Sequence, residues 1–352
     1  MPVQPARSPV SRPAPPTVRL ATCLAASLVA CLALGFSARA TGADTLRIGV
    51  GTRIATAPLH VAASRGYFER EGLEVALSPI ADDELVEALA EEDVDLATTT
   101  ADALLRAEVG GLELRGAYVL GLSGAADALV ARAEVRDTRR LRGRRVAVAP
   151  GTAGELVLRE ALQRKGRRLE DVEPVALDGI AARDALLDGD VDAAVLHGPA
   201  LAALERTTDG DGSGSGPSNG FRVLATAADP RGLVSDLLVG DESSLAATKT
   251  ATKGVIRAID RAIGWMRRHP DGSVALLSEV YAVEPEDVAR ALAGMTLFDV
   301  DENMTLLRGD FQKAFSSMSE VLDTGGDDRA REVPSANRYL ALSALRQVAA
   351  GR

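Results

Sequence analysis

Short apolar runs alternate with helical stretches along the chain after residue 44. Residues 46–50, 73–77 and 94–97 each predict a strand, because each is short, apolar and bounded by turn-forming residues. Helices are predicted between them, the first with Pro58 in its opening turn, where a missing N–H costs little. Strands that alternate with helices in this way favour parallel sheets built from βαβ units, an α/β architecture.

The same pattern returns further along the chain. Residues 145–149 and 172–177 predict strands, and the Gly-Thr-Ala-Gly stretch at 151–154 predicts a tight loop before a helix. Asp190-Val-Asp192 then repeats Asp93-Val-Asp95 at the entry to a further strand. Two copies of one pattern predict two similar lobes.

Amphipathic helices follow the second copy. Apolar residues recur at helical spacing over residues 248–269, and Pro270 is expected to end that helix. Because the chain is expected to cross between lobes near Leu129 and near Leu233, this helical tail is expected to pack on the first lobe. Further helices are predicted at 274–281, 285–293, 310–322 and 336–348, with lobe 1 formed by 44–134 and 233–352 and lobe 2 by 135–232.

Residues 1–40 have the pattern of an export signal. The uncharged run 20–36 is short for a stable membrane-spanning helix, and Ala38-Arg39-Ala40 offers the small-x-small pattern of a cleavage site. The rival interpretation is a lipoprotein signal, Leu28-Val-Ala-Cys31, which would leave Cys31 lipidated at the new N-terminus. Both alternatives predict an extracytoplasmic protein, periplasmic or lipid-anchored.

Composition and charge exclude several classes of function. The 352 residues carry a net charge of −10 and only 3 % aromatic side chains, so a nucleic-acid partner is not expected. The arginine-rich stretch 136–145 is expected to be a solvated surface. With three histidines and no spaced His/Cys set, neither a catalytic site nor a metal or cofactor is expected.

Six segments keep a characteristic order along residues 45–345. They are 57–62 (APLHVA), 66–73 (GYFEREGL), 93–95 (DVD), 141–148 (LRGRRVAV) leading into Gly151-Thr152, 190–194 (DVDAA) running to Pro199, and 265–270 (WMRRHP). Together they resemble the exported substrate-binding proteins of ABC importers, in the nitrate, sulfonate and taurine branch that also takes pyrimidine precursors. The resemblance implies a two-lobed periplasmic-binding-protein fold of type II, with two parallel or mixed sheets flanked by helices.

Ligands of open α/β sheets sit beyond the carboxyl ends of the strands, so the site is expected where the lobes face each other. Helix starts near Pro58 and Gly154 would present free N–H groups to a small anion such as a carboxylate or sulfonate. The candidate ligand-binding residues at these loops are Thr56, His60, Thr98, Thr99, Thr100, Ser123, Gly124, Gly151, Thr152, Ala153, His197, Pro199, Ser235 and Asp236.

Several of these candidates have a plain structural alternative. Thr56 is equally suited to cap a helix, Ser123-Gly124 to form a simple turn, and His197 to be a satisfied buried histidine. The resembled family often has an aromatic residue near His197, so its absence favours a smaller or more polar ligand. Asp236 is a candidate to accept an amino group, as in an aminosulfonate.

The resemblance implies a monomer that captures a small anionic organic solute and passes it to an ABC permease in the membrane. Two other functions fit the same lobes. One is an enzyme of pyrimidine or menaquinone precursor metabolism, which turnover of a bound compound would reveal. The other is a ligand-sensing module for a membrane receptor, which a neighbouring permease gene or a pull-down would distinguish.

Overall fold

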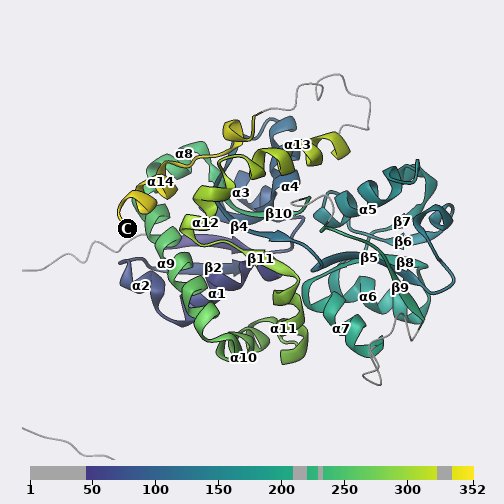
Figure 1. Cartoon of the computed structure of the whole chain (residues 1–352). Helices are drawn as coiled ribbons and strands as arrows, with labels where there is room; N and C mark the ends of the chain where they lie inside the picture. The colour runs from purple at the N-terminus through teal and green to yellow at the C-terminus, as the bar shows by residue number, and fades with distance from the viewer. Residues whose placement is uncertain (1–44, 209–219, 229–232, 323–334) are drawn as a thin grey trace, which may run out of the picture. The chain divides into compact units, whose positions relative to one another are not determined.

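The computed structural model describes residues 45–208, 220–228, 233–322 and 335–352, which form two mixed sheets with helices around them (Figure 1). The predicted export signal, with Cys31, lies outside the described residues. Within those residues no helix is long and apolar enough to cross a membrane.

The first sheet has six strands in the order β11-β4-β10-β3-β1-β2. Strand β1 pairs in parallel with β2 and β3, whereas β10 runs antiparallel to β3 and β4, and β11 antiparallel to β4. The sheet is therefore mixed. Its strands are β1 (Leu46–Val50), β2 (Val75–Pro79), β3 (Leu96–Thr100), β4 (Leu114–Ser123), β10 (Ser235–Asp241) and β11 (Met295–Leu297).

The second sheet has five strands in the order β7-β6-β8-β5-β9. They are β5 (Asp127–Arg132), β6 (Arg145–Ala147), β7 (Glu173–Val175), β8 (Ala193–His197) and β9 (Phe221–Thr226). Strand β6 is parallel to β7 and β8, and β5 is antiparallel to β8 and β9. This order matches β2-β1-β3-β10-β4 of the first sheet, so the sequence repeat is also a structural repeat.

The first crossover between the lobes lies earlier in the chain than the sequence suggested. Strand β5 pairs with β8 through Leu129 and Val195, so residues 127–132 belong to the second sheet, although the predicted boundary fell after residue 134. The chain crosses between β4 and β5 and returns between β9 and β10. An apolar run reveals that a strand is buried, but it does not reveal which of two sheets the strand joins.

Helices flank both sheets (Figure 1). Pro58 lies in the first turn of α1, as predicted, whereas Pro270 both follows α9 and opens α10, which begins earlier than expected. The helix predicted at 336–348 is divided into a 3₁₀ turn at Ala336–Tyr339 and α14. The helices are α1 (Ala57–Ser64), α2 (Tyr67–Arg70), α3 (Leu85–Ala90), α4 (Ala101–Val109), α5 (Ala153–Gln163), α6 (Gly179–Asp188), α7 (Gly198–Thr208), α8 (Glu242–Ala247), α9 (Lys249–Arg268), α10 (Pro270–Tyr281), α11 (Pro285–Ala293), α12 (Val300–Leu306), α13 (Asp310–Leu322) and α14 (Ser343–Ala350).

Two of the C-terminal helices, α9 and α14, pack on the first lobe. Ile259 of α9 and Leu345 of α14 share one buried cluster with Ile48 of β1. The helices also reach the second lobe, because Arg206 of α7 donates to Asp287 of α11 through Nε at 3.0 Å. The helical tail therefore contacts both lobes.

The two Asp-Val-Asp motifs have the same structural role. Asp95 accepts a hydrogen bond from the backbone N–H of Arg47 at 2.7 Å, and Asp192 accepts one from the backbone N–H of Arg145 at 3.0 Å. Each carboxylate also pairs with an arginine side chain, Arg47 in the first lobe and Arg144 in the second. In both lobes the motif ties the start of the first strand to the entry of the third.

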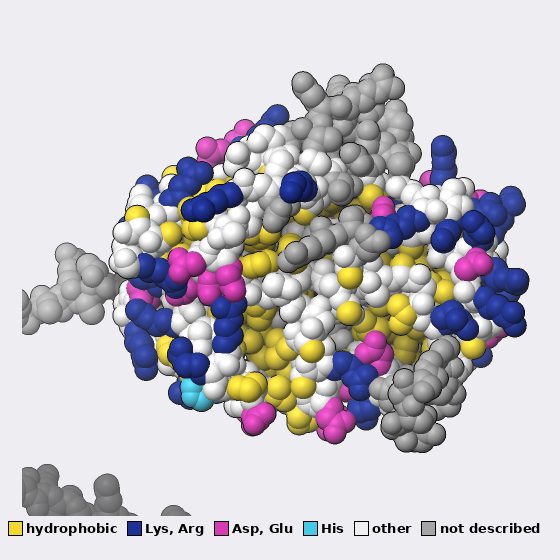
Figure 2. Space-filling view, in the orientation of Figure 1, with side chains coloured by type: hydrophobic (Ala, Val, Ile, Leu, Met, Phe, Trp, Pro, Cys, Tyr) yellow, Lys and Arg dark blue, Asp and Glu magenta, His cyan; other side chains and the backbone are white. Residues whose placement is uncertain are grey.

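The arginine-rich stretch 136–145 lies on the surface of the second lobe, and its arginines are exposed. Figure 2 shows basic side chains at the end of this lobe, with acidic side chains among them. Arg144 pairs with Asp192, and Arg142 lies 3.8 Å from Asp171. The stretch is a solvated surface with local acidic partners.

Candidate functional site

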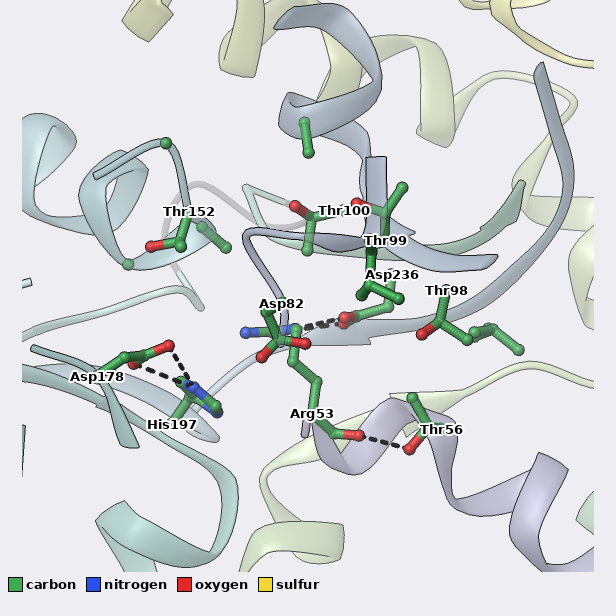
Figure 3. Close-up of a pocket in the computed structure, with 16 residues that line it drawn as sticks. Arg53, Thr56, Asp82, Thr98, Thr99, Thr100, Thr152, Asp178, His197 and Asp236 are labelled. Carbon is green, nitrogen blue, oxygen red and sulfur yellow. Dashed lines mark hydrogen bonds and ion pairs between the residues drawn. The ribbon is translucent and has the colours of Figure 1, made fainter. Parts of the chain in front are cut away.

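A pocket lies between the lobes, at the carboxyl ends of their parallel strands (Figure 3). Its volume is about 30 Å³, enough for one or two water molecules. With the lobes as they stand, this volume has no room for a larger solute. The pocket is lined by Arg53, Thr56, Asp82, Leu85, Thr98, Thr99, Thr100, Ala103, Leu120 and Asp236 of the first lobe and by Gly151, Thr152, Ala153, Gly154, Asp178 and His197 of the second.

A buried ion network, the hinge triad of Arg53, Asp127 and Asp236, forms the floor of this pocket. Arg53 lies in the loop after β1 and binds Asp127 with two N–H groups, at 2.9 and 3.0 Å. Its Nε donates to Asp236 at 2.5 Å. Asp127 begins β5 of the second sheet and Asp236 lies in β10 of the first, so one guanidinium joins the two lobes at both crossovers.

The hinge triad neutralises the only arginine that lines the pocket among the described residues. The Arg53 side chain is 9 % exposed, and four of its donor contacts go to the two carboxylates. Burial raises the pKa of Asp127, but the charge and hydrogen bonds of Arg53 outweigh burial and lower it overall. The pKa of Asp236 is raised, because burial outweighs its contact with Arg53. Arg53 therefore directs four of its five N–H groups to the two carboxylates of the hinge triad.

The predicted residues of the first crossover support the hinge triad and do not line the pocket. The hydroxyl of Ser123 donates to Asp127, and the N–H of Gly124 donates to the carbonyl of Gly294 at 3.0 Å. Gly294 is required here, because a Cβ at this position would lie 2.6 Å from the backbone nitrogen of Ala126. Ser235, at the return crossover, is buried and also lies outside the pocket lining.

Thr56 and His60 lie on the same helix start but face different surroundings. Thr56 lines the pocket, and its hydroxyl donates to the carbonyl of Arg53 at 2.9 Å rather than capping the helix N-terminus. His60 does not line the pocket; its ring meets that of Tyr281 edge to face at 5.6 Å. Burial lowers the pKa of His60, which favours its neutral form.

Threonines from both lobes line the upper part of the pocket, with Thr152 opposite Thr100 (Figure 3). Thr98 accepts a hydrogen bond from the N–H of Gly51 at 3.0 Å, and Thr152 donates to the carbonyl of Ala149 at 2.8 Å. The hydroxyls of Thr99 and Thr100 receive no side-chain hydrogen bond from the described part of the chain. These two hydroxyls are therefore free to bind a solute.

The start of α5 also lines the pocket, through Gly151, Thr152 and Ala153, which are three of the sequence candidates. The N–H of Gly151 donates to the carboxylate of Glu155 at 2.8 Å. A carboxylate at this position already offsets part of the positive end of the helix dipole. The helix start is thus a weaker anion site than a bare N-terminus would be.

His197 and Asp178 form an ion pair on the second-lobe side of the pocket. The ring Nε2 of His197 lies 3.3 Å from Asp178. Burial alone would lower the pKa of His197, but the hydrogen bond and charge of Asp178 raise it to about 9. Burial would likewise raise the pKa of Asp178, but His197 lowers it to about 2. Pro199, in the first turn of α7, does not line the pocket.

Three charged pocket residues were not among the sequence candidates. Arg53, Asp82 and Asp178 lie in the loops after β1, β2 and β7. Most of the sequence candidates lie at or after the ends of the first and third strands of each lobe, whereas Asp82 and Asp178 lie after the second strands. Polar residues after every parallel strand are the signal that could have found Asp82 and Asp178.

One group of these side chains has the composition of a metal-binding site. Single ligand atoms of Asp82, Asp178 and His197 all lie within 4.8 Å of one another. At neutral pH His197 is protonated because of its contact with Asp178, so a metal ion would first have to displace that proton.

Comparisons with known proteins agree with this architecture. The profile of the family described as NMT1/THI5 like matches residues 54–273. A protein of Brucella abortus named as a binding protein is 22 % identical over 302 residues, which cover 84 % of this chain and 91 % of that protein.

Two solved structures show the same fold. The alkanesulfonate-binding protein SsuA from Xanthomonas axonopodis pv. citri, bound to MOPS, is 22 % identical with a TM-score of 0.65, over 83 % of this chain and 95 % of that one. The nitrate-binding protein NrtA from Synechocystis PCC 6803 is 13 % identical with a TM-score of 0.69, over 88 % and 89 %. The chain thus has the two-lobed periplasmic-binding-protein fold of type II, as expected.

Proposed function

This chain belongs to the NMT1/THI5-like family, and from that membership we propose that it is a solute-binding protein of an ABC importer. One observation carries the proposal: polar side chains from both lobes line a single pocket above a hinge that the chain crosses twice. Relatives of the same length and fold are named as binding proteins. A site shared between two lobes is suited to coupling solute capture to lobe closure.

Closure is supported by contacts at two levels of the cleft. At the floor, the hinge triad fixes the two crossovers relative to each other. Nearer the mouth, Arg106 of α4 donates to the carbonyl of Gly151 in the second lobe at 2.7 Å. The closed form would present a continuous surface of both lobes to the permease.

The solute is proposed to carry an oxoanion, such as a sulfonate or carboxylate. The free hydroxyls of Thr99 and Thr100 and the adjacent start of α5 support this part of the proposal. The names of the related alkanesulfonate- and nitrate-binding proteins agree with it. The proposed location is outside the cytoplasm, reached through the signal at residues 1–40, either as a soluble monomer or anchored at Cys31.

Thermal unfolding of the purified protein with a panel of solutes tests this proposal. The panel contains taurine, alkyl- and arylsulfonates, nitrate, bicarbonate, dicarboxylates and pyrimidines, with an inert salt as control. A solute at roughly 1,000 times its dissociation constant adds about 4 kcal/mol to the free energy of unfolding. A saturable rise in Tm, with the solute recovered unchanged by mass spectrometry, is the expected result. Chemical conversion of the bound compound would instead identify an enzyme.

A further inference from the structure

The first turn of α4 holds a buried carboxylate with one side-chain partner. Asp102 is fully buried, and its Oδ2 accepts a hydrogen bond from Arg106, one turn further along the helix. Its Oδ1 has no hydrogen-bond partner in the described residues. Because a buried carboxylate is costly without its counter-charge, Asp102 holds the guanidinium of Arg106 in place.

The same guanidinium reaches the second lobe. Nη2 of Arg106 donates to the carbonyl of Gly151 at 2.7 Å, in the loop before α5. This nitrogen carries two hydrogens, one for Asp102 and one for the carbonyl. Ala103 of α4 and Gly151 both line the pocket, so the contact lies at the pocket wall. We call Asp102, Arg106 and Gly151 the cleft latch.

The second-lobe side of the cleft latch also carries negative charge. The carboxylate of Glu155 accepts the N–H of Gly151 at 2.8 Å and pairs with Arg159. Burial raises the pKa of Glu155, but the N–H of Gly151, the contact with Arg159 and the charge of Arg106 together lower it. Arg106 is therefore attracted to a carboxylate of the opposite lobe as well as to a carbonyl.

The cleft latch differs from two other arginine contacts between the lobes in what it costs to break. The Arg53 side chain of the hinge triad is 9 % exposed, and Asp287, which binds Arg206 at 3.0 and 3.1 Å, is 3 % exposed. Separation at either place would leave a buried carboxylate without its cation. Arg106 is 31 % exposed and keeps Asp102 on opening, so only its contacts with the second lobe give way to water.

We propose that the cleft latch is the contact that breaks and re-forms as the lobes move, and that it sets how often the pocket opens. The inference rests on the proposed function for the purpose of closure. It adds Asp102 as a positioning residue, which acts only through Arg106. The hinge triad and the pair of Arg206 with Asp287 keep the lobes joined while the latch is open.

A cysteine in the pocket reports opening without any solute. Thr99→Cys places a thiol at a lining position that is 6 % exposed, in the full-length chain with Cys23→Ser and Cys31→Ser. The rate of its reaction with methyl methanethiolsulfonate, followed by mass spectrometry, depends on how often the cleft opens. Ala62→Cys is the control reporter, because it lies in the core of the first lobe and only unfolding exposes it.

Both reporters are combined with changes in the cleft latch. Arg106→Met removes the cross-cleft donor. Asp102→Asn/Arg106→Met removes that donor together with the buried charge, which limits the loss of stability. The matched control is Arg159→Met, because Arg159 makes an i,i+4 pair of similar exposure with Glu155 but stays within one lobe.

Arg106→Met and the double variant are expected to speed labelling of Thr99→Cys about three- to tenfold, the ratio for one hydrogen bond. Labelling of Ala62→Cys should not change in the double variant, and Arg159→Met should leave both rates unchanged. Asp102→Asn alone should give a smaller rise at Thr99→Cys and should add nothing once Arg106 is replaced. This lack of additivity is expected of a positioning residue and not of a merely structural one.

Three results would overturn the inference. They are equal labelling rates in the double variant and the unchanged latch, an equal rise in Arg159→Met, and a rise at Ala62→Cys in the double variant as large as that at Thr99→Cys. Additive effects of the two latch substitutions would remove the role assigned to Asp102. No solute is present in these measurements, so each of these results leaves the proposed function to be decided by the solute panel.

Discussion

The two lobes share one frame and differ in the loops that face the cleft. Both sheets follow the same strand order, and in both an Asp-Val-Asp motif ties the first strand to the third. After the first strand, however, lobe 1 supplies the buried Arg53, whereas lobe 2 supplies the start of α5 at Thr152. After the third strand, lobe 1 supplies threonines and lobe 2 supplies His197.

This difference shows how a repeated architecture forms one asymmetric site. Equivalent loops contribute unlike groups. The loops after the first strands contribute Arg53 in one lobe and the start of α5 in the other, and the loops after the third strands contribute threonine hydroxyls and the imidazole of His197. Only the loops after the second strands contribute like groups, Asp82 and Asp178. The frame brings the loops together, and the loop residues decide what the pocket binds.

Arg53→Met should give the largest loss, because it leaves Asp127 and Asp236 buried without their cation. Removal of one partner from a buried ion network costs about 3–5 kcal/mol of unfolding free energy. Urea denaturation measures the change. The control is Arg164→Met, which removes a surface i,i+4 pair with Glu160 and should cost less than about 0.5 kcal/mol. Similar losses in the two variants would mean that the hinge triad does not stabilise the fold.

The His197–Asp178 pair should make stability depend on pH in the alkaline range. The folded-state pKa of His197 is about 9, above the unfolded value of about 6.5. Its contribution of about 2–3 kcal/mol should therefore be complete below pH 6.5 and should disappear as the pH rises through 9. Urea denaturation between pH 6 and 9.5 measures this slope. His197→Gln should flatten it, and an unchanged slope in that variant would contradict the assignment.

Asp95→Ala and Asp192→Ala test whether the frame is equivalent in the two lobes. Each removes a carboxylate that accepts a backbone N–H bond and pairs with an arginine, so each should cost about 1–2 kcal/mol. The first aspartates of the same motifs, Asp93 and Asp190, lie nearer the surface and serve as matched controls. A large loss in one lobe with none in the other would show that the motifs are not equivalent.

Thr152→Val should have the smallest effect on stability. It removes one half-buried hydrogen bond to the carbonyl of Ala149, which is about 0.5–1 kcal/mol. Because Thr152 lines the pocket, the same change should weaken binding of an oxoanion solute in calorimetry. A variant that binds as tightly as the unchanged protein would place the anion away from α5.

Much of the fold could be predicted from local pattern. Apolar runs located β1, β2, β3, β6, β7 and β8, the repeated motif indicated two lobes, and helical spacing located α9, α11 and α13, whereas β4, β9 and β11 were not predicted. The assignment of β5 could not be predicted, because burial of 127–132 is compatible with either sheet. The prediction of one continuous helix over 336–348 was also wrong. Residues 336–339 form a 3₁₀ turn, and α14 begins only at Ser343.

The sequence indicated which loops could form the candidate site, but it did not indicate the charged residues Arg53, Asp82 and Asp178 that line the pocket. Thr98, Thr99, Thr100, Thr152, Ala153 and His197 were located by the rule that ligands bind beyond strand ends, and the structure places all of them around one pocket. His60, Ser123, Gly124, Pro199 and Ser235 satisfied the same rule and lie outside its lining. The rule names loops, whereas the direction of each side chain depends on what it packs against.

Local pattern was enough to indicate most of the strands and helices, the two-lobed repeat and several of the loops that bear polar groups, because these depend on periodicity and on residues near one another in the chain. Only the tertiary structure decided the electrostatics of the pocket. Arg53 meets Asp127 and Asp236, and Asp82 meets Asp178, across long stretches of chain. Charge interactions depend on distance in space and on burial, and folding alone sets both.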